Sequence, residues 1–223
     1  MMKCVTIAGV GMALALAAMS MPVAAKSLDR TQLDLAITKA DASDADADPK
    51  AYMANFQAAL TEAQKLYPAS HPEIAARRQG IATALASQGK MDEASAIIEA
   101  VLPGLEKAGP AYLRPLADTY NVRGYIANLR GDHAAAIADF QRSLDLNRAM
   151  AAGKPNKEVA IQMSNLAATK WEAGLAEDTL AMNADAIAMA RTLTPVPMDV
   201  AIWYSNRVAY LQTMGRSNDA VTT

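Results

Sequence analysis

The sequence predicts an all-α fold, an α–α superhelix built from successive antiparallel helix pairs. Two kinds of residue recur with a period that is typical of repeats containing two helices. The first is a glycine at the end of a helical pattern, and the successive positions differ by 42, 43 and 41: Gly89, Gly131, Gly174 and Gly215. The second is a proline near the start of each unit, where the positions differ by 43, 40 and 42: Pro72, Pro115, Pro155 and Pro197. Proline suits the first turn of a helix and glycine suits its end, so both residues divide the chain into the same units.

The packing between the paired helices is indicated by small and large residues at fixed places. After Gly131, a small, a large and a small side chain follow on one helix face: Ala136, Phe140 and Ser143. The same face after Gly89 carries Ala94, Ile98 and Val101. Seven positions before each glycine, a residue with a small or slim side chain indicates a place where the partner helix can be approached closely: Ala82, Gly124, Ala167 and Val208. We therefore expect close packing, with Phe140 filling a hollow beside a small residue.

The unit over residues 120–146 carries this pattern most completely, with Gly124, Gly131, Ala136 and Phe140 in place. It resembles the tetratricopeptide repeat (TPR), and the period is similar to that of the long repeats of kinesin light chains. The linker over residues 67–72, Tyr-Pro-Ala-Ser-His-Pro, resembles the linkers of that family. The resemblance covers residues 50–223, with the last repeat incomplete. The third unit departs from it, because Thr179 replaces the alanine and Asn183 replaces the large apolar residue.

Residues 1–25 have the features of a secretory signal peptide. Lys3 precedes an apolar run over residues 5–21, and small residues follow at Val23-Ala24-Ala25. We expect cleavage near Lys26, and the alternative is an uncleaved membrane anchor. The only cysteine, Cys4, lies within this segment. The sequence thus predicts a periplasmic or secreted protein that makes no membrane contact after cleavage.

Residues 26–49 precede the repeats. A helix is expected over residues 28–40, and we interpret it as an N-terminal cap. The acidic tract over residues 41–48 has alternating aspartates, but an EF-hand loop beginning at Asp44 would need glycine where Pro49 stands and glutamate where Asn55 stands. We therefore interpret the tract as a linker whose charge favours the start of the next helix.

The remaining composition gives no support for a cofactor, a metal site or nucleic-acid binding. The formal net charge is −2, and loss of Lys3 leaves 20 basic and 23 acidic side chains, a charge of −3. The two histidines, His71 in a linker and His133 at the start of a helix, are far apart in sequence. Catalytic and zinc sites need clustered groups, so we expect a protein that is not an enzyme.

In proteins of this architecture, the first helix of each pair lines a concave groove, and here that face carries amides and hydroxyls. Such groups can bond to the backbone of an extended peptide, while the aromatic rings supply apolar contact. Ala168 and Ala209 lie on the same face. The predicted partner-binding residues are Asn121, Tyr125, Asn128, Ser164, Asn165, Trp171, Ser205, Asn206 and Gln212.

The last predicted helix, over residues 198–214, is followed by only half a repeat. We expect its apolar residues Ile202, Val208 and Leu211 to lack cover from the same chain. A longer protein or a homodimer formed through this end would supply the cover.

These observations predict an exported, non-catalytic scaffold that binds a peptide or protein partner. Two alternatives stay open. One is a self-assembling structural protein. The other follows from the resemblance, because bacterial proteins of this kind can carry a caspase-like peptidase domain after their repeats, which would make this the regulatory N-terminal region of a larger exported enzyme.

Overall fold

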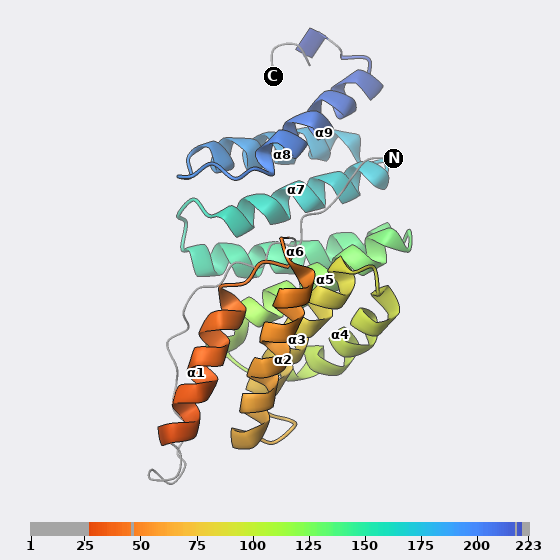
Figure 1. Cartoon of the computed structure of the whole chain (residues 1–223). Helices are drawn as coiled ribbons and strands as arrows, with labels where there is room; N and C mark the ends of the chain where they lie inside the picture. The colour runs from red at the N-terminus through yellow and green to blue at the C-terminus, as the bar shows by residue number, and fades with distance from the viewer. Residues whose placement is uncertain (1–26, 46, 217, 220–223) are drawn as a thin grey trace. The chain divides into compact units, whose positions relative to one another are not determined.

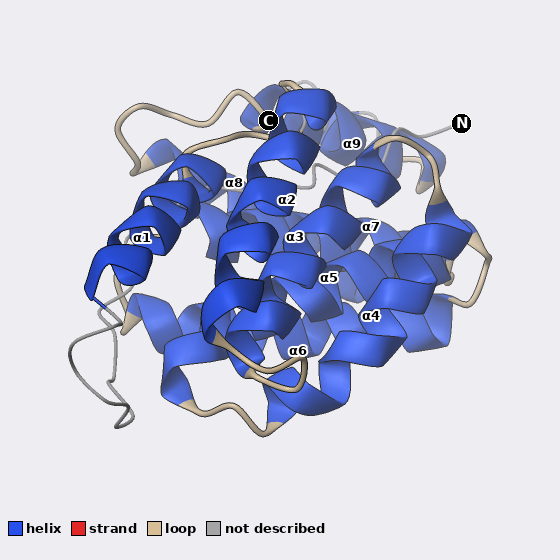
Figure 2. Cartoon of the chain, turned by 60° about the horizontal axis from the view of Figure 1, so that its bottom comes forward, coloured by secondary structure: helices blue, strands red, loops and turns tan. Residues whose placement is uncertain are grey.

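A computed structural model describes residues 27–45, 47–216 and 218–219, so the predicted signal peptide lies outside the described residues. Within them every regular element is a helix (Figure 2). The helices are α1 (Ser27–Asp41), α2 (Pro49–Leu66), α3 (Pro72–Ser87), α4 (Met91–Glu106), η1 (Pro110–Tyr112), α5 (Leu113–Leu129), α6 (His133–Ala151), α7 (Lys157–Glu172), α8 (Ala176–Arg191) and α9 (Val200–Thr213). The all-α prediction is confirmed.

The chain divides within α5 into an N-terminal unit that ends at Arg123 and a C-terminal unit that starts at Gly124. In the N-terminal unit α1 packs against α2, α2 against α3, and α3 against α4. In the C-terminal unit α6, α7, α8 and α9 pack in the same successive manner, and α7 also contacts α9 (Figure 1). Each helix thus packs mainly against its neighbours in sequence, as expected for stacked helix pairs.

The sequence signals for helix ends have their expected structural roles. The side chain of Asp48 caps α2 by accepting hydrogen bonds from the backbone N–H groups of Lys50 and Ala51, at 3.1 and 2.9 Å. Pro72 opens α3, and the four repeat glycines all have φ between 71° and 79°. A side chain at these four positions would be strained, because positive φ brings Cβ close to the backbone.

The hollow predicted beside Gly124 is filled by Phe140. The Phe140 ring is fully buried, and a Cβ placed on Gly124 would lie 3.1 Å from its Cδ1 atom. A second contact of this kind was not predicted: Gly80 on α3 lies against the ring of Phe56 on α2. Glycine thus lets an aromatic ring approach the helix backbone in each unit.

The two polar residues that depart from the repeat pattern in the third unit, Thr179 and Asn183, are buried and hydrogen-bonded. The hydroxyl of Thr179 donates to the carbonyl of Leu175 at 2.9 Å, and the Nδ2 of Asn183 donates to the carbonyl of Trp203 at 3.3 Å. Asn183 therefore joins α8 to α9 by a polar contact, at the position in the repeat that Phe140 occupies in the preceding unit.

The expectation of an uncovered apolar face on α9 is wrong for one of its three residues. Leu211 is buried and belongs to a cluster with Leu180 and Tyr210, against which Trp171 and Met214 also pack. The reason is that α9 turns this side toward α8, so earlier helices of the same chain cover it. Val208 is half-buried, and only Ile202 is exposed.

Candidate binding site

The nine predicted binding residues lie on the first helices of three pairs, α5, α7 and α9. Their exposure differs sharply. Ser205 and Gln212 are exposed, and Tyr125 and Trp171 are half-buried. The other five are buried: Asn121, Asn128, Ser164, Asn165 and Asn206. In the C-terminal unit, the helix that carries Ser164 and Asn165 is α7, which contacts α6, α8 and α9, so few of its side chains face solvent.

One buried amide connects three helices of the C-terminal unit. The Nδ2 of Asn128 on α5 donates to Glu172 on α7 at 2.7 Å, and its Oδ1 lies 2.9 Å from the Nδ1 of His133 on α6. His133 thus contacts the preceding helix through Asn128. Because its Nδ2 and its Oδ1 are both in use, Asn128 serves to join helices and is poorly placed to bind a ligand.

Two other buried amides differ, because each has an atom without a hydrogen-bond partner in the described structure. Asn121 on α5 is 4% exposed and its Oδ1 is unpaired, and Asn165 on α7 is 5% exposed and its Nδ2 is unpaired. Most buried polar atoms in folded proteins are paired, so unpaired atoms need an explanation. Asn121 belongs to the N-terminal unit and Asn165 to the C-terminal unit, where the buried Gln162 on the same helix also has an unpaired Oε1.

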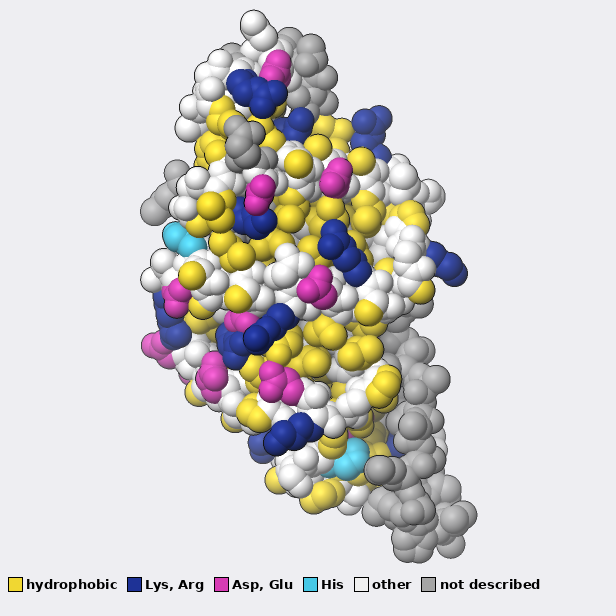
Figure 3. All heavy atoms as spheres, turned by 180° about the vertical axis from the view of Figure 1, so that it is seen from behind, with side chains coloured by type: hydrophobic (Ala, Val, Ile, Leu, Met, Phe, Trp, Pro, Cys, Tyr) yellow, Lys and Arg dark blue, Asp and Glu magenta, His cyan; other side chains and the backbone are white. Residues whose placement is uncertain are grey.

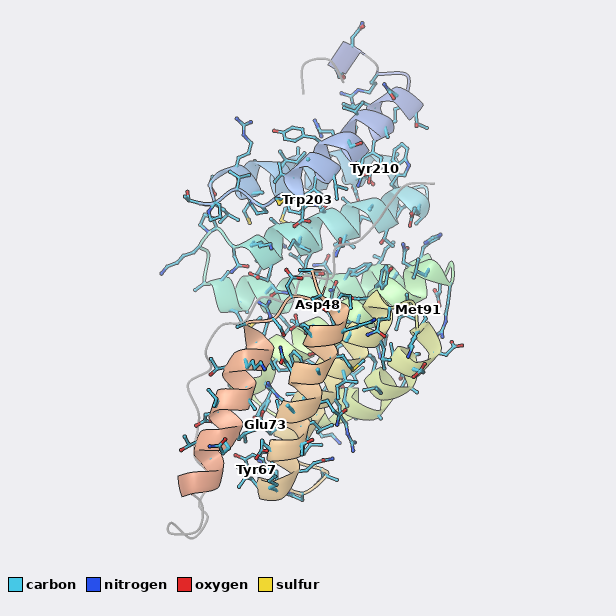
Figure 4. The ribbon with its side chains drawn as sticks, viewed as in Figure 1. Asp48, Tyr67, Glu73, Met91, Trp203 and Tyr210 are labelled. Atoms are coloured by element: carbon cyan, nitrogen blue, oxygen red, sulfur yellow. The ribbon has the colours of Figure 1, made fainter. Side chains whose placement is uncertain are left out.

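The half-buried ring of Trp171 lies against Tyr210, with the ring centroids 4.6 Å apart and the planes inclined by 35°. Figure 4 labels Tyr210 on α9, together with Trp203 on the same helix. This aromatic pair joins α7 to α9 and leaves part of the Trp171 ring accessible. It can offer an apolar surface to a ligand while it also stabilises the packing.

The first-helix face of the N-terminal unit carries charges that were not among the predicted site residues. On α3 the Nε of Arg77 lies 3.0 Å from Glu73, and its Nη1 lies 3.4 Å from Asp41 at the end of α1. Arg77 is only 4% exposed. Similar ion pairs join Arg30 to Asp34 on α1, at 3.1 Å, and Arg114 to Asp118 on α5, at 3.3 Å.

A sequence signal for these pairs is present. In each pair the second residue stands four positions after the first, and the first members, Arg30, Glu73 and Arg114, have position numbers that differ by 43 and 41, close to the repeat period. A comparison of charged residues between units would have found them. The small and apolar residues that define the repeat give no indication of these ion pairs.

Burial changes the acidity of groups near these ion pairs. It raises the pKa of Asp41 above its ordinary value, although the charges of Arg77 and Arg114 act in the opposite direction. Burial also raises the pKa of Tyr52, and the nearby carboxylates of Asp118 and Asp41 raise it further. In both groups burial is the largest cause, and the charges of the neighbouring residues modify its effect.

A second group of polar side chains lies at the start of α3, where Figure 4 shows Tyr67 and Glu73 near one another. The rings of Tyr67 and His71 are stacked with centroids 4.0 Å apart, and Arg30 donates a hydrogen bond to the Tyr67 hydroxyl. Burial lowers the pKa of His71 and raises the pKa of Tyr112 to about 12. The neutral imidazole of His71 accepts a hydrogen bond from the backbone N–H of Glu73 at 3.1 Å, which caps α3.

The described residues include no group of three histidine, cysteine, aspartate or glutamate side chains able to hold a metal ion. Among the same residues, no helix is both long and apolar enough to cross a membrane. On the face drawn in Figure 3, positive and negative side chains are interspersed between areas of hydrophobic side chains. That face therefore offers no large surface of a single charge sign.

Comparison with solved structures shows which known folds this structure resembles. The structure is similar to the crystal structure of BtubC (BKLC) from P. vanneervenii, with a TM-score of 0.66 and 19% sequence identity, over 88% of this chain and 76% of that chain. It is also similar to a kinesin light chain with nearly identical TPR-like repeats from Podosopora anserina, with a TM-score of 0.60 and 15% identity, over 86% of this chain and 90% of that chain. A variant of the latter protein gives a TM-score of 0.61 at 15% identity, over 86% of this chain and 89% of that chain.

These similarities show a TPR-type repeat fold, in agreement with the resemblance found in the sequence. Repeat folds of this type serve as scaffolds for protein interactions. No protein-family model matches the chain, and no curated protein matches it.

Proposed function

We propose that the chain is an exported, non-catalytic scaffold whose first-helix faces bind extended segments of a partner protein. One observation carries the proposal: the unpaired Oδ1 of Asn121 and the unpaired Nδ2 of Asn165, each buried on a first helix of its own unit. One atom is an acceptor and the other a donor. A peptide backbone offers an N–H donor and a carbonyl acceptor at every residue other than proline, so a bound backbone could satisfy either kind of atom.

The binding test compares two asparagines that are similarly buried but differ in their pairing. Asn165 has an unpaired Nδ2, whereas the Nδ2 of Asn147 on α6 donates to the carbonyl of Ser143 at 2.9 Å. The probe is a pool of fluorescent decapeptides of random sequence, passed over the immobilised protein. A sequence recovered from this pool then serves to measure affinity for each variant.

We expect Asn165→Ala to bind the recovered peptide about tenfold more weakly, the effect of one hydrogen bond in a desolvated site. Its stability should be unchanged or higher, because the substitution removes an unsatisfied donor. Asn147→Ala should show the reverse, a loss of about 1 kcal/mol in stability with unchanged affinity. The proposal fails if no peptide is retained, or if Asn165→Ala loses as much stability as Asn147→Ala.

Export is the second part of the proposal, and it rests on the basic, apolar and small-residue segments of residues 1–25. Expression of the full chain in a Gram-negative host, followed by cell fractionation and intact-mass measurement, tests it. Recovery from the periplasm with a mass that begins near Lys26 would support export. A full-length protein in the membrane fraction would show instead that the segment is an anchor.

A further inference from the structure

A chain of contacts joins the start of α3 to α1 through the linker that follows α2, within the N-terminal unit (Figure 4). The backbone N–H of Glu73 donates to the Nδ1 of His71 at 3.1 Å. The imidazole stacks on the ring of Tyr67, with the centroids 4.0 Å apart and the planes inclined by 11°. The Tyr67 hydroxyl accepts a hydrogen bond from Arg30 on α1, and the Nε of Arg30 donates to Asp34 at 3.1 Å.

Both ends of this chain of contacts belong to packed helices. On α3 the side chain of Glu73 is buried and pairs with Arg77 at 3.0 Å, so the first turn of the helix is held in place. On α1, Leu33 is fully buried between Arg30 and Asp34 in the sequence. Histidine is the residue type whose ordinary pKa lies nearest to neutral pH, so the imidazole between the two helices is the group most easily changed by mild acidification.

Protonation of His71 opposes this arrangement in two ways. The neutral Nδ1 accepts a hydrogen bond, whereas both nitrogens of an imidazolium are donors, so the backbone N–H of Glu73 loses its acceptor. The new positive charge also lies at the N-terminal end of α3, where the helix dipole disfavours cations. Without the cap the imidazole is no longer attached to α3, and the Tyr67 ring loses the fixed surface on which it stacks.

We propose that His71, Tyr67 and Arg30 form an acid-sensitive clasp, which holds the N-terminal half of α1 against the linker while the imidazole is neutral and releases it when the imidazole is protonated. Release frees Arg30 from the Tyr67 hydroxyl and exposes the apolar side of α1 that includes Leu33. The C-terminal end of α1 keeps its separate contact with α3. The inference goes beyond the proposed function and does not depend on it.

The acidity of His71 agrees with the clasp. Burial is the largest cause that lowers the pKa of the imidazole below its ordinary value of 6.5; the carboxylate of Glu73 acts in the opposite direction, and the charge of Arg30 lowers the pKa further. The folded state therefore binds the proton less tightly than the unfolded chain, so stability that is present above pH 6.5 is lost as the pH falls. Burial raises the pKa of Tyr67 and of Tyr112, and both phenols stay neutral over this range.

The other charges on the three helices around the clasp are engaged in ion pairs. Asp34 pairs with Arg30 on α1, and Arg77 pairs with Glu73 on α3. In the last turn of α2, Lys65 pairs with Glu62 at 2.7 Å. Asp41 at the end of α1 has a raised pKa, so it is a second group that can take up a proton on acidification, and the experiment must separate its effect from that of His71.

Hydrogen exchange of the backbone amides, measured by mass spectrometry on the full chain, tests the clasp. The protection factor of α1 is compared at about pH 7.5 and about pH 5, after correction for the intrinsic effect of pH on exchange. We expect α1 to lose about tenfold in protection at the lower pH, an effect of the size of one helix cap. The internal control is α7, because its cap, the side chain of Asn156, does not titrate.

Three variants assign the effect. His71→Asn keeps a side chain that can cap α3 but does not titrate, so it should remove the difference between the two pH values. Tyr67→Phe keeps the stacked ring and removes the hydroxyl that Arg30 contacts, so α1 should have low protection at both pH values. His133→Asn changes the other histidine of the chain, and it is the matched control that should retain the wild-type response.

The inference is overturned if α1 of the wild-type chain keeps its protection at the lower pH, or if His71→Asn shows the same loss, which would assign the response to another group such as Asp41. An unchanged response in Tyr67→Phe would equally refute the link through Arg30. If His71→Asn does not fold, NMR of the wild-type chain decides. The pH midpoint of the changes in the α1 amide signals should equal the midpoint of the His71 ring signals, and a clear difference between the two midpoints overturns the inference.

Discussion

Gly80→Ala provides a sharp test of the packing in the N-terminal unit, because two effects of known sign oppose each other. In a helix interior, alanine is more favourable than glycine by about 1 kcal/mol. However, a Cβ on Gly80 would lie 2.0 Å from the Cδ1 of Phe56 and 2.5 Å from its Cγ, whereas carbon atoms in contact are ordinarily separated by about 3.5–4.0 Å. The ring would have to move by about 1.5 Å.

The Phe56 ring has little freedom to make that movement. It lies 4.6 Å from the ring of Tyr52, centroid to centroid, and the guanidinium of Arg77 lies 5.7 Å from its centroid. Overpacking of a core costs about 1–3 kcal/mol, and occasionally more. Together with the gain from helix propensity, this predicts that Gly80→Ala lowers the free energy of unfolding by up to about 2 kcal/mol.

The assay is urea unfolding followed by circular dichroism, for Gly80→Ala in the wild-type chain and in the Phe56→Ala chain. Without the ring the clash is gone, so the same substitution should raise stability by about 1 kcal/mol in the second background. This reversal of sign is the signature of a direct contact. If Gly80→Ala is stabilising in both backgrounds, or equally destabilising in both, the ring does not lie against the α3 backbone and the reasoning is refuted.

Two further predictions concern the other unit and the charged cluster. Phe140→Ala should lower the free energy of unfolding by about 3–5 kcal/mol in urea titrations, since the ring is fully buried beside Gly124, and a loss below about 1 kcal/mol would contradict the assigned packing. For Asp41, the raised pKa means that the folded state binds the proton more tightly than the unfolded chain, so stability is lost as pH rises through the folded-state pKa. Asp41→Asn should therefore be more stable than wild type at pH 7. Thermal melts should show that the difference in stability between the two proteins shrinks as the pH falls toward 3.8, the ordinary pKa. A difference that grows on acidification would contradict the raised pKa of Asp41.

Helix boundaries and pairings could be predicted from the sequence because they depend on local chemistry that repeats. Glycine at positive φ and proline in a first turn act over a short stretch of chain, and their recurrence marks every unit. The contact of Phe140 with Gly124 was predictable for a related reason, since a large residue and a gap of matching size recur at fixed offsets.

The accessibility of the candidate site could not be predicted in the same way. Helical periodicity assigned Asn165 to a face, but whether that face is open depends on how closely the neighbouring helices approach it. In the structure α7 has neighbours on several sides, which buries Asn165 and Ser164 while Ser205 on α9 stays exposed. The cover on Leu211 could not be predicted for the same reason, because α9 turns that residue toward an earlier helix.

The charged face of the N-terminal unit depends on a contact between distant parts of the chain, which small and apolar repeat positions do not indicate. Arg77 and Asp41 are separated by 36 positions, and their contact requires α1 to end beside α3. The interpretation of α1 as a cap did not predict this arrangement. In the structure α1 packs against α2, and Asp41 at its end contacts Arg77 on α3.

The distribution of aromatic residues determines what spectroscopy can detect in this molecule. Both tryptophans, Trp171 and Trp203, belong to the C-terminal unit, so intrinsic tryptophan fluorescence follows the melting of that half alone. The two phenylalanines of the chain are divided evenly, with Phe56 in one unit and Phe140 in the other, and each lies against a glycine. Fluorine-labelled phenylalanine would therefore give one resonance from each half, and loss of the two signals at different urea concentrations would reveal that the halves unfold separately.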